Sequence, residues 1–145
     1  MINRDNAVTE IMDRTNEGIT GENLPYPDFE LKHLELTPVN PVGRNQMPCV
    51  LFFEDIDTII KRTKRDPVGF PLVRTLNLIV ELWDFDTVKV KQLYLAVRKS
   101  ILANGGDLGC ATAIETKNIG PFTALQEGAI GMRIILDVTY IDKNL

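Results

Sequence analysis

The sequence from residue 73 to residue 103 is VRTLNLIVELWDFDTVKVKQLYLAVRKSILA, and it holds the two clearest secondary-structure signals in the chain. From 73 to 84, apolar residues at alternate positions predict a strand with one fully aliphatic face. That face consists of Leu76, Leu78, Val80 and Leu82. From 87 to 103, apolar residues recur every three or four positions and predict an amphipathic helix, with Asp86 as its N-cap. A strand followed at once by such a helix predicts that the helix covers the aliphatic face.

Working outward, the spacing of apolar residues predicts a first helix over about 5–17, which Gly18 ends. Strands are expected over 29–37, 49–56, 110–116 and 129–141. Proline and glycine predict irregular segments over about 18–28 and 38–48, and residues 59–71 read as a basic loop or projecting hairpin. This order of elements predicts an α+β fold. We expect one domain over residues 1–145, with a mostly antiparallel sheet and helices packed on one side.

Composition narrows the class of protein. The chain has 145 residues, of which 44% are hydrophobic and 25% charged, as in an average globular domain. This excludes collagen-like, low-complexity and wholly disordered chains, and no apolar run is long enough to predict a membrane span. The net charge of −4 argues against sequence-independent DNA binding as the main function. Two cysteines are too few for a disulfide scaffold, so we expect synthesis in a reducing cytoplasm.

Few residues form a pattern that predicts chemistry. His33 is the only histidine, and it has no metal-ligand spacing with Cys49 or Cys110, so we interpret it as an ordinary strand residue. Two acidic pairs stand where strands are expected to end; they are Asp55 with Asp57 and Asp84 with Asp86. Such residues favour turns and helix caps, although paired carboxylates could also hold a divalent cation or serve as general acid and base. We therefore assign no catalytic, cofactor-binding or metal-binding residue.

Two features predict contacts with other proteins. Four cations, Lys61, Arg62, Lys64 and Arg65, fall within five residues. Such a run is either a solvated loop or a contact for an acidic surface, and the acidic balance of the chain favours a protein partner over DNA phosphates. Ile79 and Trp83 lie on the second face of the long strand. We expect that face to form a subunit interface or, alternatively, to be buried under the first helix.

The order of four segments resembles a known family. The segments are PCVLFFED at 48–55, RTLNLIVELW at 74–83, VKQLYLAVRKSIL at 90–102 and GAIGMRIILDVTY at 128–140. This order resembles the tail terminator (tail completion, minor tail protein U-like) family of tailed bacteriophages, in which a Thr-Leu-x-Leu-x-Val-Glu strand precedes a helix. The family's closing Leu-x-Val-x-Tyr strand is matched by Leu136, Val138 and Tyr140. The resemblance covers most of 47–142, whereas 21–48 has no clear counterpart.

The resemblance implies a structural virion protein that is not an enzyme and has no cofactor. It implies a ring, usually a hexamer, on the head-proximal end of the tail tube, which stops tube polymerisation and joins the tail to the neck and head. The expected partners are further copies of the chain, the tail tube protein and neck or connector proteins, with transient DNA contact in the lumen and no membrane contact. The alternatives are another head–tail connector, neck or tube subunit, or a small metal-dependent α+β enzyme.

Overall fold

The computed structural model describes residues 3–62, 72–123 and 128–142. Its helices are α1 (Asn3–Gly18) and α2 (Thr87–Ile101). Its strands are β1 (His33–Leu36), β2 (Cys49–Arg62), β3 (Leu72–Asp84), β4 (Ala111–Thr123) and β5 (Ile130–Asp142). Short 3-10 helices occupy Gly21–Asn23, Arg44–Gln46 and Ala103–Gly106.

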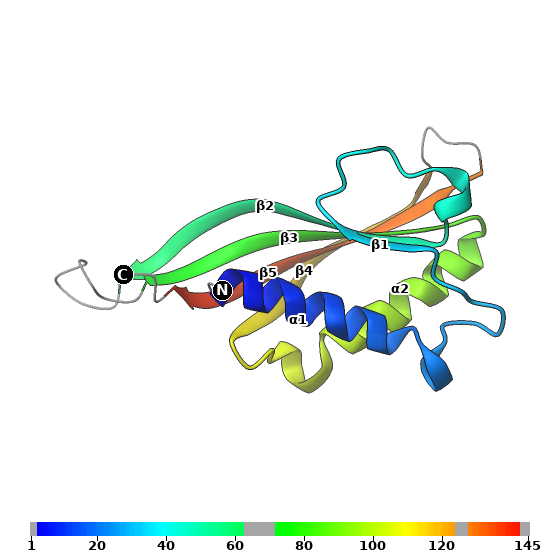
Figure 1. Cartoon of the computed structure of the whole chain (residues 1–145). Coiled ribbons are helices and arrows are strands. Elements are labelled where there is room, and N and C mark those ends of the chain that lie inside the picture. Colours follow the sequence, from blue (N-terminus) through cyan, green and yellow to red (C-terminus); the bar gives the residue numbers. More distant parts are fainter. Residues whose placement is uncertain (1–2, 63–71, 124–127, 143–145) are drawn as a thin grey trace.

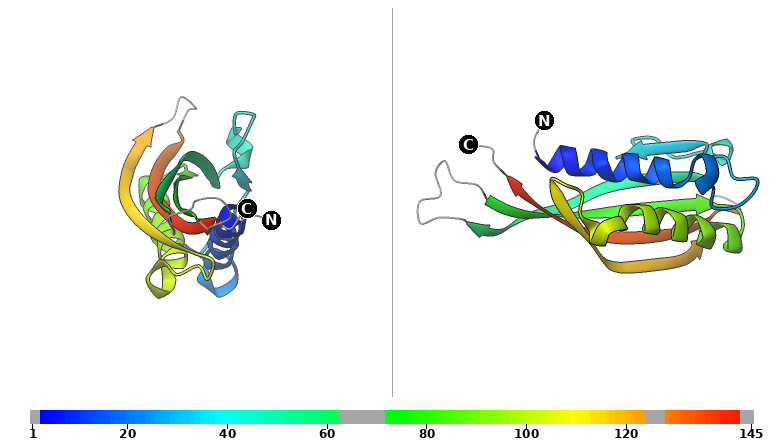
Figure 2. Two further views of the ribbon diagram at one scale, coloured as in Figure 1. Left: turned by 90° about the vertical axis from the view of Figure 1, so that its left-hand side faces the viewer. Right: turned by 90° about the horizontal axis from the view of Figure 1, so that it is seen from below.

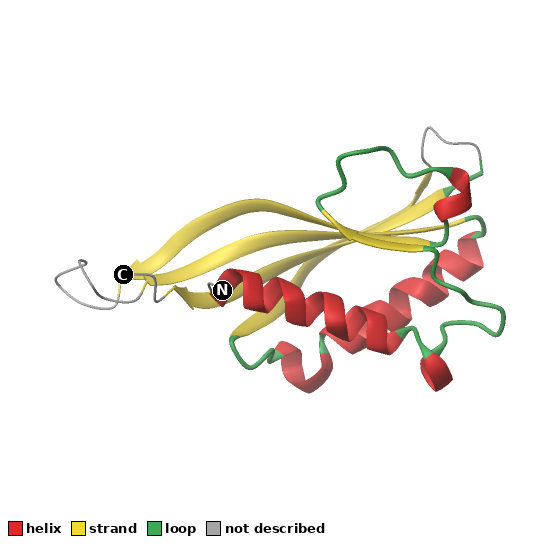
Figure 3. Cartoon of the chain, viewed as in Figure 1, coloured by secondary structure: helices red, strands yellow, loops and turns green. Residues whose placement is uncertain are grey.

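The strands form one sheet in the order β1-β2-β3-β5-β4. Only β1 runs parallel to its neighbour, and the other three pairings are antiparallel. Both helices lie on the same side of this sheet and form a single helix layer (Figures 1 and 3). The predicted α+β class, with a mostly antiparallel sheet and helices on one side of a single domain, is therefore confirmed.

The core lies between the sheet and the helix layer (Figure 2). The four aliphatic side chains of β3 are at most 1% exposed, and α2 buries Val90, Leu93, Val97 and Ile101 against the sheet. Helix α2 begins as predicted, because the Asp86 carboxylate accepts hydrogen bonds from the backbone N–H groups of Val88 and Lys89 at 2.9 and 3.1 Å. Alternation in the strand and 3.6-residue spacing in the helix therefore identify the two faces that meet.

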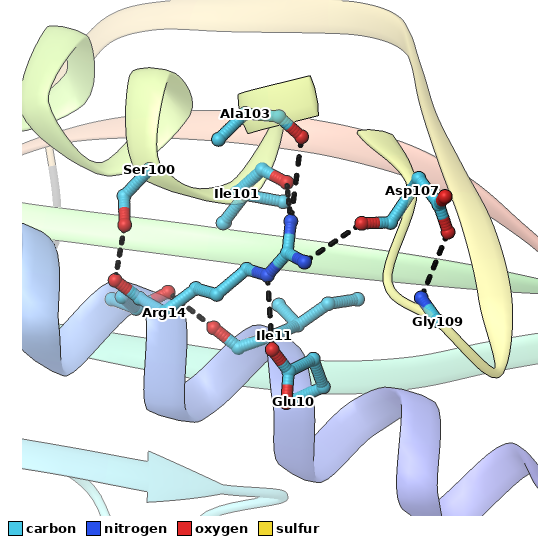
Figure 4. A network of polar contacts seen from close by, with 9 residues as sticks. Glu10, Ile11, Arg14, Ser100, Ile101, Ala103, Asp107 and Gly109 are labelled. Carbon is cyan, nitrogen blue, oxygen red and sulfur yellow. Dashed lines mark hydrogen bonds and ion pairs between the residues drawn. The ribbon is translucent and has the colours of Figure 1, made fainter. Parts of the chain in front are cut away.

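Helix α1 packs beside α2, so the alternative that it covers the second face of β3 is wrong. The side chain of Arg14 joins the two helices at the C-terminal end of α2 (Figure 4). Its guanidinium donates to the backbone carbonyls of Ile101, Ala103 and Asp107 at 3.5, 3.4 and 2.7 Å. In the opposite direction, the Ser100 hydroxyl donates to the carbonyl of Arg14. Carbonyls at a helix C-terminus lack partners within the helix, so Arg14 acts as a cap supplied by the neighbouring helix.

Three expected boundaries are wrong. β2 continues to Arg62 instead of ending at 56, because its residues pair with β3 beyond a register irregularity between Glu54 and Asp57. β4 continues to Thr123 and includes Pro121, which is tolerated because β4 lies at the edge of the sheet. β1 covers only four residues of the expected strand 29–37. Residues 59–62, expected to be loop, thus belong to β2, and 63–71 lie outside the described residues.

Candidate interaction surface on the outer face of the sheet

We call the sheet face turned away from α1 and α2 the outer face. Antiparallel partners point to the same side of a sheet, so the register identifies its residues. From β3 and β5 it contains the pairs Thr75–Thr139, Asn77–Asp137, Ile79–Ile135, Glu81–Arg133 and Trp83–Gly131. β2 adds Cys49, Leu51 and Phe53, and β4 adds Ile114, Ile119 and Phe122.

The polar residues in the centre of the outer face bond to one another across the strands. The Asn77 amide donates to the Asp137 carboxylate at 3.2 Å, and the hydroxyls of Thr75 and Thr139 lie 3.2 Å apart. Closer to the other end of β3, the Arg133 guanidinium donates to the Glu81 carboxylate at 2.7 Å. Thus the polar groups in the centre of this face have partners within the chain.

Between these polar pairs runs an apolar row of Phe53, Ile79 and Ile135, which are adjacent in register on β2, β3 and β5. All three are only partly buried. On the edge strand β4, Ile114 is 57% exposed. A sheet face that carries partly exposed isoleucines beside already paired polar groups resembles the centre of a protein–protein interface in its chemistry.

The expectation for Trp83 needs a correction. Trp83 is only 8% exposed, because the segment 38–48 folds over this end of the outer face and brings Met47 and Val42 into the apolar cluster that contains Trp83. The Phe122 ring meets Trp83 edge to face, with centroids 5.0 Å apart. Trp83 is thus covered by its own chain, although not by the first helix, and of the two expected interface residues only Ile79 remains partly exposed.

The same segment leaves a pocket of about 400 Å³ beside Trp83. Its lining is mainly apolar and includes Pro38, Val39, Phe53 and Trp83. Its charged group is the Glu81 carboxylate, which accepts a hydrogen bond from the indole N–H of Trp83 at 3.3 Å. Val39 is 90% exposed at the pocket rim. Sequence reasoning missed this pocket, since no local pattern connects residues 38–48 with a strand 40 residues later.

The two edges of the sheet differ. At one edge, β1 pairs only with residues 49–52 of β2, so residues 53–62 have no strand partner on that side within the described part of the chain. At the other edge lies β4, whose register is irregular near Lys117 and again between Ile119 and Phe122. Bulges and charged side chains at strand edges limit uncontrolled pairing with other chains. Two unlike edges provide two different surfaces for contact with neighbours.

The basic run is only partly described. Lys61 and Arg62 are the last two residues of β2, where they pair with Val73 and Leu72 of β3. Lys64 and Arg65 lie outside the described residues. In Figure 1 this end of β2 and β3 extends beyond the start of α1, far from the outer-face end that 38–48 covers. The structure thus places Lys61 and Arg62 at the tip of two paired strands and separates them from Ile79.

Three of the four aspartates in the acidic pairs have structural roles. Asp84 is 4% exposed and accepts hydrogen bonds from the hydroxyl of Tyr26 and the N–H of Phe85, while Asp86 caps α2. Asp57, however, does not mark a strand end. It lies inside β2 and accepts a hydrogen bond from the Tyr140 hydroxyl at 2.6 Å. Within the residues that the structure describes, no group of three or more potential ligands is arranged to hold a metal ion.

Asp57 also lies near two arginines from other elements, Arg4 of α1 at 3.6 Å and Arg74 of β3 at 3.8 Å. Burial, followed by the hydrogen bond to Asp57, raises the pKa of Tyr140 above its usual value. This cluster ties the start of α1 to the sheet, since its members come from α1, β2, β3 and β5. Sequence reasoning missed it because the residues are far apart along the chain.

The structure also places the histidine and the two cysteines. The ring of His33 lies 2.6 Å from the carboxylate of Glu35, two residues along β1, as expected for an ordinary strand histidine. Cys49 is fully buried, and burial, with the nearby carboxylates of Glu81 and Asp84, raises the pKa of its thiol to about 12. A thiol in this environment is not an activated nucleophile. Cys110 is half-buried and free.

Comparisons with known proteins do not assign this chain to a family. Neither the protein-family models nor the curated proteins give a match to this chain. Among the described residues, no helix has the length and apolar character needed to cross a membrane.

Proposed function

We propose that this chain is a structural subunit of a tailed-bacteriophage virion. Copies of it assemble as a ring, hexameric by the resemblance, on the head-proximal end of the tail tube. The ring stops tube polymerisation and joins the tail to the neck and head. In this role the chain acts through the shape of its surfaces and transforms no substrate.

The outer face is the observation that carries the proposal. A ring of identical subunits needs a heterologous contact, in which one surface of each copy meets a different surface of the next. The apolar row of Phe53, Ile79 and Ile135 offers area for such a contact, and the paired polar groups beside it need no ligands from the partner. The unlike sheet edges at β2 and β4 supply the two sides.

The segments at the two ends of the sheet are suited to contacts with other proteins. At one end, 38–48 presents Val39, 90% exposed between two prolines, beside the apolar pocket. At the opposite end, β2 and β3 project with Lys61 and Arg62. A ring subunit that joins tube to neck needs contacts in both axial directions, and these two ends lie at opposite extremes of the sheet (Figure 1).

The first test is sedimentation velocity and negative-stain microscopy of the purified chain, alone and with the tail tube protein. The proposal expects an equilibrium between monomer and ring that depends on concentration and that the tube protein shifts toward the ring. A chain that stays monomeric in the micromolar range and ignores the tube protein contradicts it.

A variant makes the test specific to the outer face. Ile79→Asp puts a charge into the apolar row and is expected to abolish ring formation, because an unpaired carboxylate in an interface is costly. Asn104→Asp is the matched control: Asn104 is exposed, lies in the 3-10 helix after α2, and has a positive φ of 57° that aspartate also tolerates. Both variants must keep the wild-type circular dichroism. Equal ring formation by both would remove the outer face from the interface.

Disabling the gene during infection separates the proposed role from related ones. Overlong tails are expected when a terminator is missing, since nothing then stops the tube. Heads without tails beside tails of normal length would instead indicate a neck or connector role.

A further inference from the structure

The helix layer separates its charges by helix. Helix α2 carries four cations, Lys89, Lys91, Arg98 and Lys99, and no acidic residue. Helix α1 carries four acidic residues and two arginines. Helices α1 and α2 lie side by side on the sheet (Figure 2). The helix layer therefore combines one mainly acidic helix with one basic helix.

Some of these charges have partners within the chain. Arg14 of α1 pairs with Glu10 at 3.1 Å, and Arg98 of α2 pairs with Glu115 of β4 at 3.0 Å. Lys89 lies over the ring of Tyr26, with the ammonium 5.2 Å from the ring centroid.

Four charges of the two helices have no such contact: Asp13 and Glu17 on α1, and Lys91 and Lys99 on α2. All four are exposed, and none forms an ion pair within the described part of the chain. Like charges along each helix repel one another and are stabilised when an oppositely charged surface approaches. Helix α1 thus carries an acidic strip, Asp13 and Glu17, and helix α2 a basic strip, Lys91 and Lys99, and Glu17 and Lys99 are the members that lie across one groove from each other.

This groove, of about 590 Å³, lies between α2 on one side and the end of α1 with residues 23–25 on the other. Its residues include the small Gly18 and Ala96, and Glu17 and Lys99 line it from the two helices. Exposed apolar side chains accompany it, with Leu24 41% and Leu95 60% exposed. An apolar centre bordered by charged residues is the usual arrangement of a protein interface.

We propose that this helix layer binds the helix layer of a second copy of the chain, related by a twofold axis parallel to the helices. Such a rotation places α1 of each copy opposite α2 of the other. The acidic strip, with Glu17, then faces the partner's basic strip, with Lys99, and the same contact occurs twice because a twofold interface is self-complementary. Leu24 and Leu95 lie in the centre.

A second copy is the occupant that the charges favour. A partner with one sign of charge would be attracted by one strip and repelled by the other, whereas a partner that carries both strips side by side satisfies both. The chain itself is such a partner.

The size of the layer sets the strength of the contact. Helix α1 has 16 residues and α2 has 15. Two helices of this length, each about 10 Å wide, give a footprint of about 20 by 24 Å. This is smaller than the roughly 800 Å² per partner of a standard stable interface. We therefore expect a weak dimer, with a Kd in the micromolar range or above, that increasing salt dissociates because the charges are exposed.

The inference does not depend on the proposed ring, because the helix layer and the outer face lie on opposite sides of the sheet (Figure 1). If the ring forms through the outer face and the sheet edges, the helix layers remain free to join two rings. The experiment is therefore done in the wild-type chain and again with Ile79→Asp, which blocks the ring contact.

Charge reversal tests the pairing of the strips. The α1 variant is Asp13→Lys with Glu17→Lys, and the α2 variant is Lys91→Glu with Lys99→Glu. Each alone places like charges opposite one another and is expected to weaken dimerisation about tenfold or more in sedimentation equilibrium at low salt. An equimolar mixture of the two variants should dimerise again, as a heterodimer. A chain carrying all four changes should also dimerise with itself, and it serves as the matched control because its net charge equals that of the wild type.

Each outcome either supports or overturns the inference. Loss in the single-helix variants with recovery in the mixture and in the fourfold variant supports the inference, whether or not rings are seen. Equal association of all variants overturns the inference and leaves the proposed ring standing. Loss in only one variant, without recovery on mixing, overturns it in favour of a different partner. A wild-type chain that shows no dimer at low salt even at about 1 mM, well above the expected Kd, overturns the inference, whereas the proposed ring is judged by its own test with the tube protein. If a variant fails to fold by circular dichroism, the neutral pairs Asp13→Asn with Glu17→Gln and Lys91→Gln with Lys99→Gln replace it.

Discussion

Replacing Arg14 by alanine tests whether the two helices are joined by the cap that α1 gives to α2. Arg14 donates at 2.7 Å to the carbonyl of Asp107, and at 3.4 and 3.5 Å to those of Ala103 and Ile101. Only the first distance is that of a strong bond, since geometry beyond about 3.2 Å gives little. One hydrogen bond from a charged donor contributes roughly 1.5–3 kcal/mol. We therefore expect Arg14→Ala to lower the free energy of unfolding by about 2 kcal/mol.

Urea unfolding followed by circular dichroism measures this loss, and thermal unfolding should show a fall in Tm of about 4–8 °C. Arg14→Lys should recover only part of the loss, because an ammonium cannot donate to several carbonyls in one plane. Glu10→Ala is the control: it removes the ion partner of Arg14 but no carbonyl contact, and exposed i,i+4 pairs contribute about 0.3–0.5 kcal/mol. Equal losses in Arg14→Ala and Glu10→Ala would refute the capping role.

Three further predictions concern other positions. Asp86→Ala should lower the free energy of unfolding by about 1 kcal/mol in the same urea assay, because it removes the N-cap of α2. Gly106→Ala should cost more than about 2 kcal/mol or prevent folding, since its φ is +82° and a Cβ would lie 2.0 Å from the carbonyl oxygen of Ala113. In the native chain at pH 8, a thiol reagent should modify Cys110 but reach Cys49 only after unfolding. Folding raises the pKa of the Cys49 thiol from 9.0 to about 12. The thiol therefore contributes fully to the free energy of unfolding below about pH 9, and this contribution is lost as the pH rises toward 12. Urea titrations of Cys49→Ala should show a smaller loss of stability at alkaline pH than those of the wild type.

The elements that the sequence predicts correctly are those in which local pattern and tertiary packing agree. β3 and β5 alternate because each has one face under the helices, and α2 shows a single apolar stripe for the same reason. The cap at Asp86 is local as well, since it joins a side chain to backbone two and three residues later. These elements determine the fold class.

The end of β2 illustrates where local pattern fails. Asp55 and Asp57 indicate a strand end, because aspartate is rare in strands. In the structure, pairing with β3 continues past them to Arg62, and Asp57 gains the hydroxyl of Tyr140 and two nearby arginines. Contacts with residues as far as 83 positions away in the chain thus make a charged residue suitable for a strand, and no local sequence pattern contains them.

The burial of Trp83 by another segment of the chain could not be predicted for the same reason. Alternation in β3 correctly places Trp83 opposite the helix-covered face, but it does not say whether another segment covers that face. The covering segment, 38–48, has no periodicity and is recognisable only as a loop rich in proline. The outer face was therefore predictable as a face, whereas the division between its covered end at Trp83 and its open centre at Ile79 was not.

The two proposed surfaces differ in what a partner must supply. On the outer face, Asn77 and Arg133 already bond to Asp137 and Glu81, so a partner that covers Ile79 gains apolar burial without having to satisfy these groups. Removing water from the ion pair of Arg133 and Glu81 still costs free energy, and this cost limits the affinity that the buried apolar area provides.

On the helix layer the situation is reversed. The exposed charges of Asp13, Glu17, Lys91 and Lys99 have no ion partner in the described chain, so covering them with an apolar surface would leave buried charges unpaired. Only a partner with the opposite pattern avoids this cost. Shape and apolar area therefore govern contacts of the outer face, so added salt should not dissociate them. Charge pattern governs contacts of the helix layer, so added salt should weaken them. Salt alone should separate the two kinds of association in one preparation of the protein.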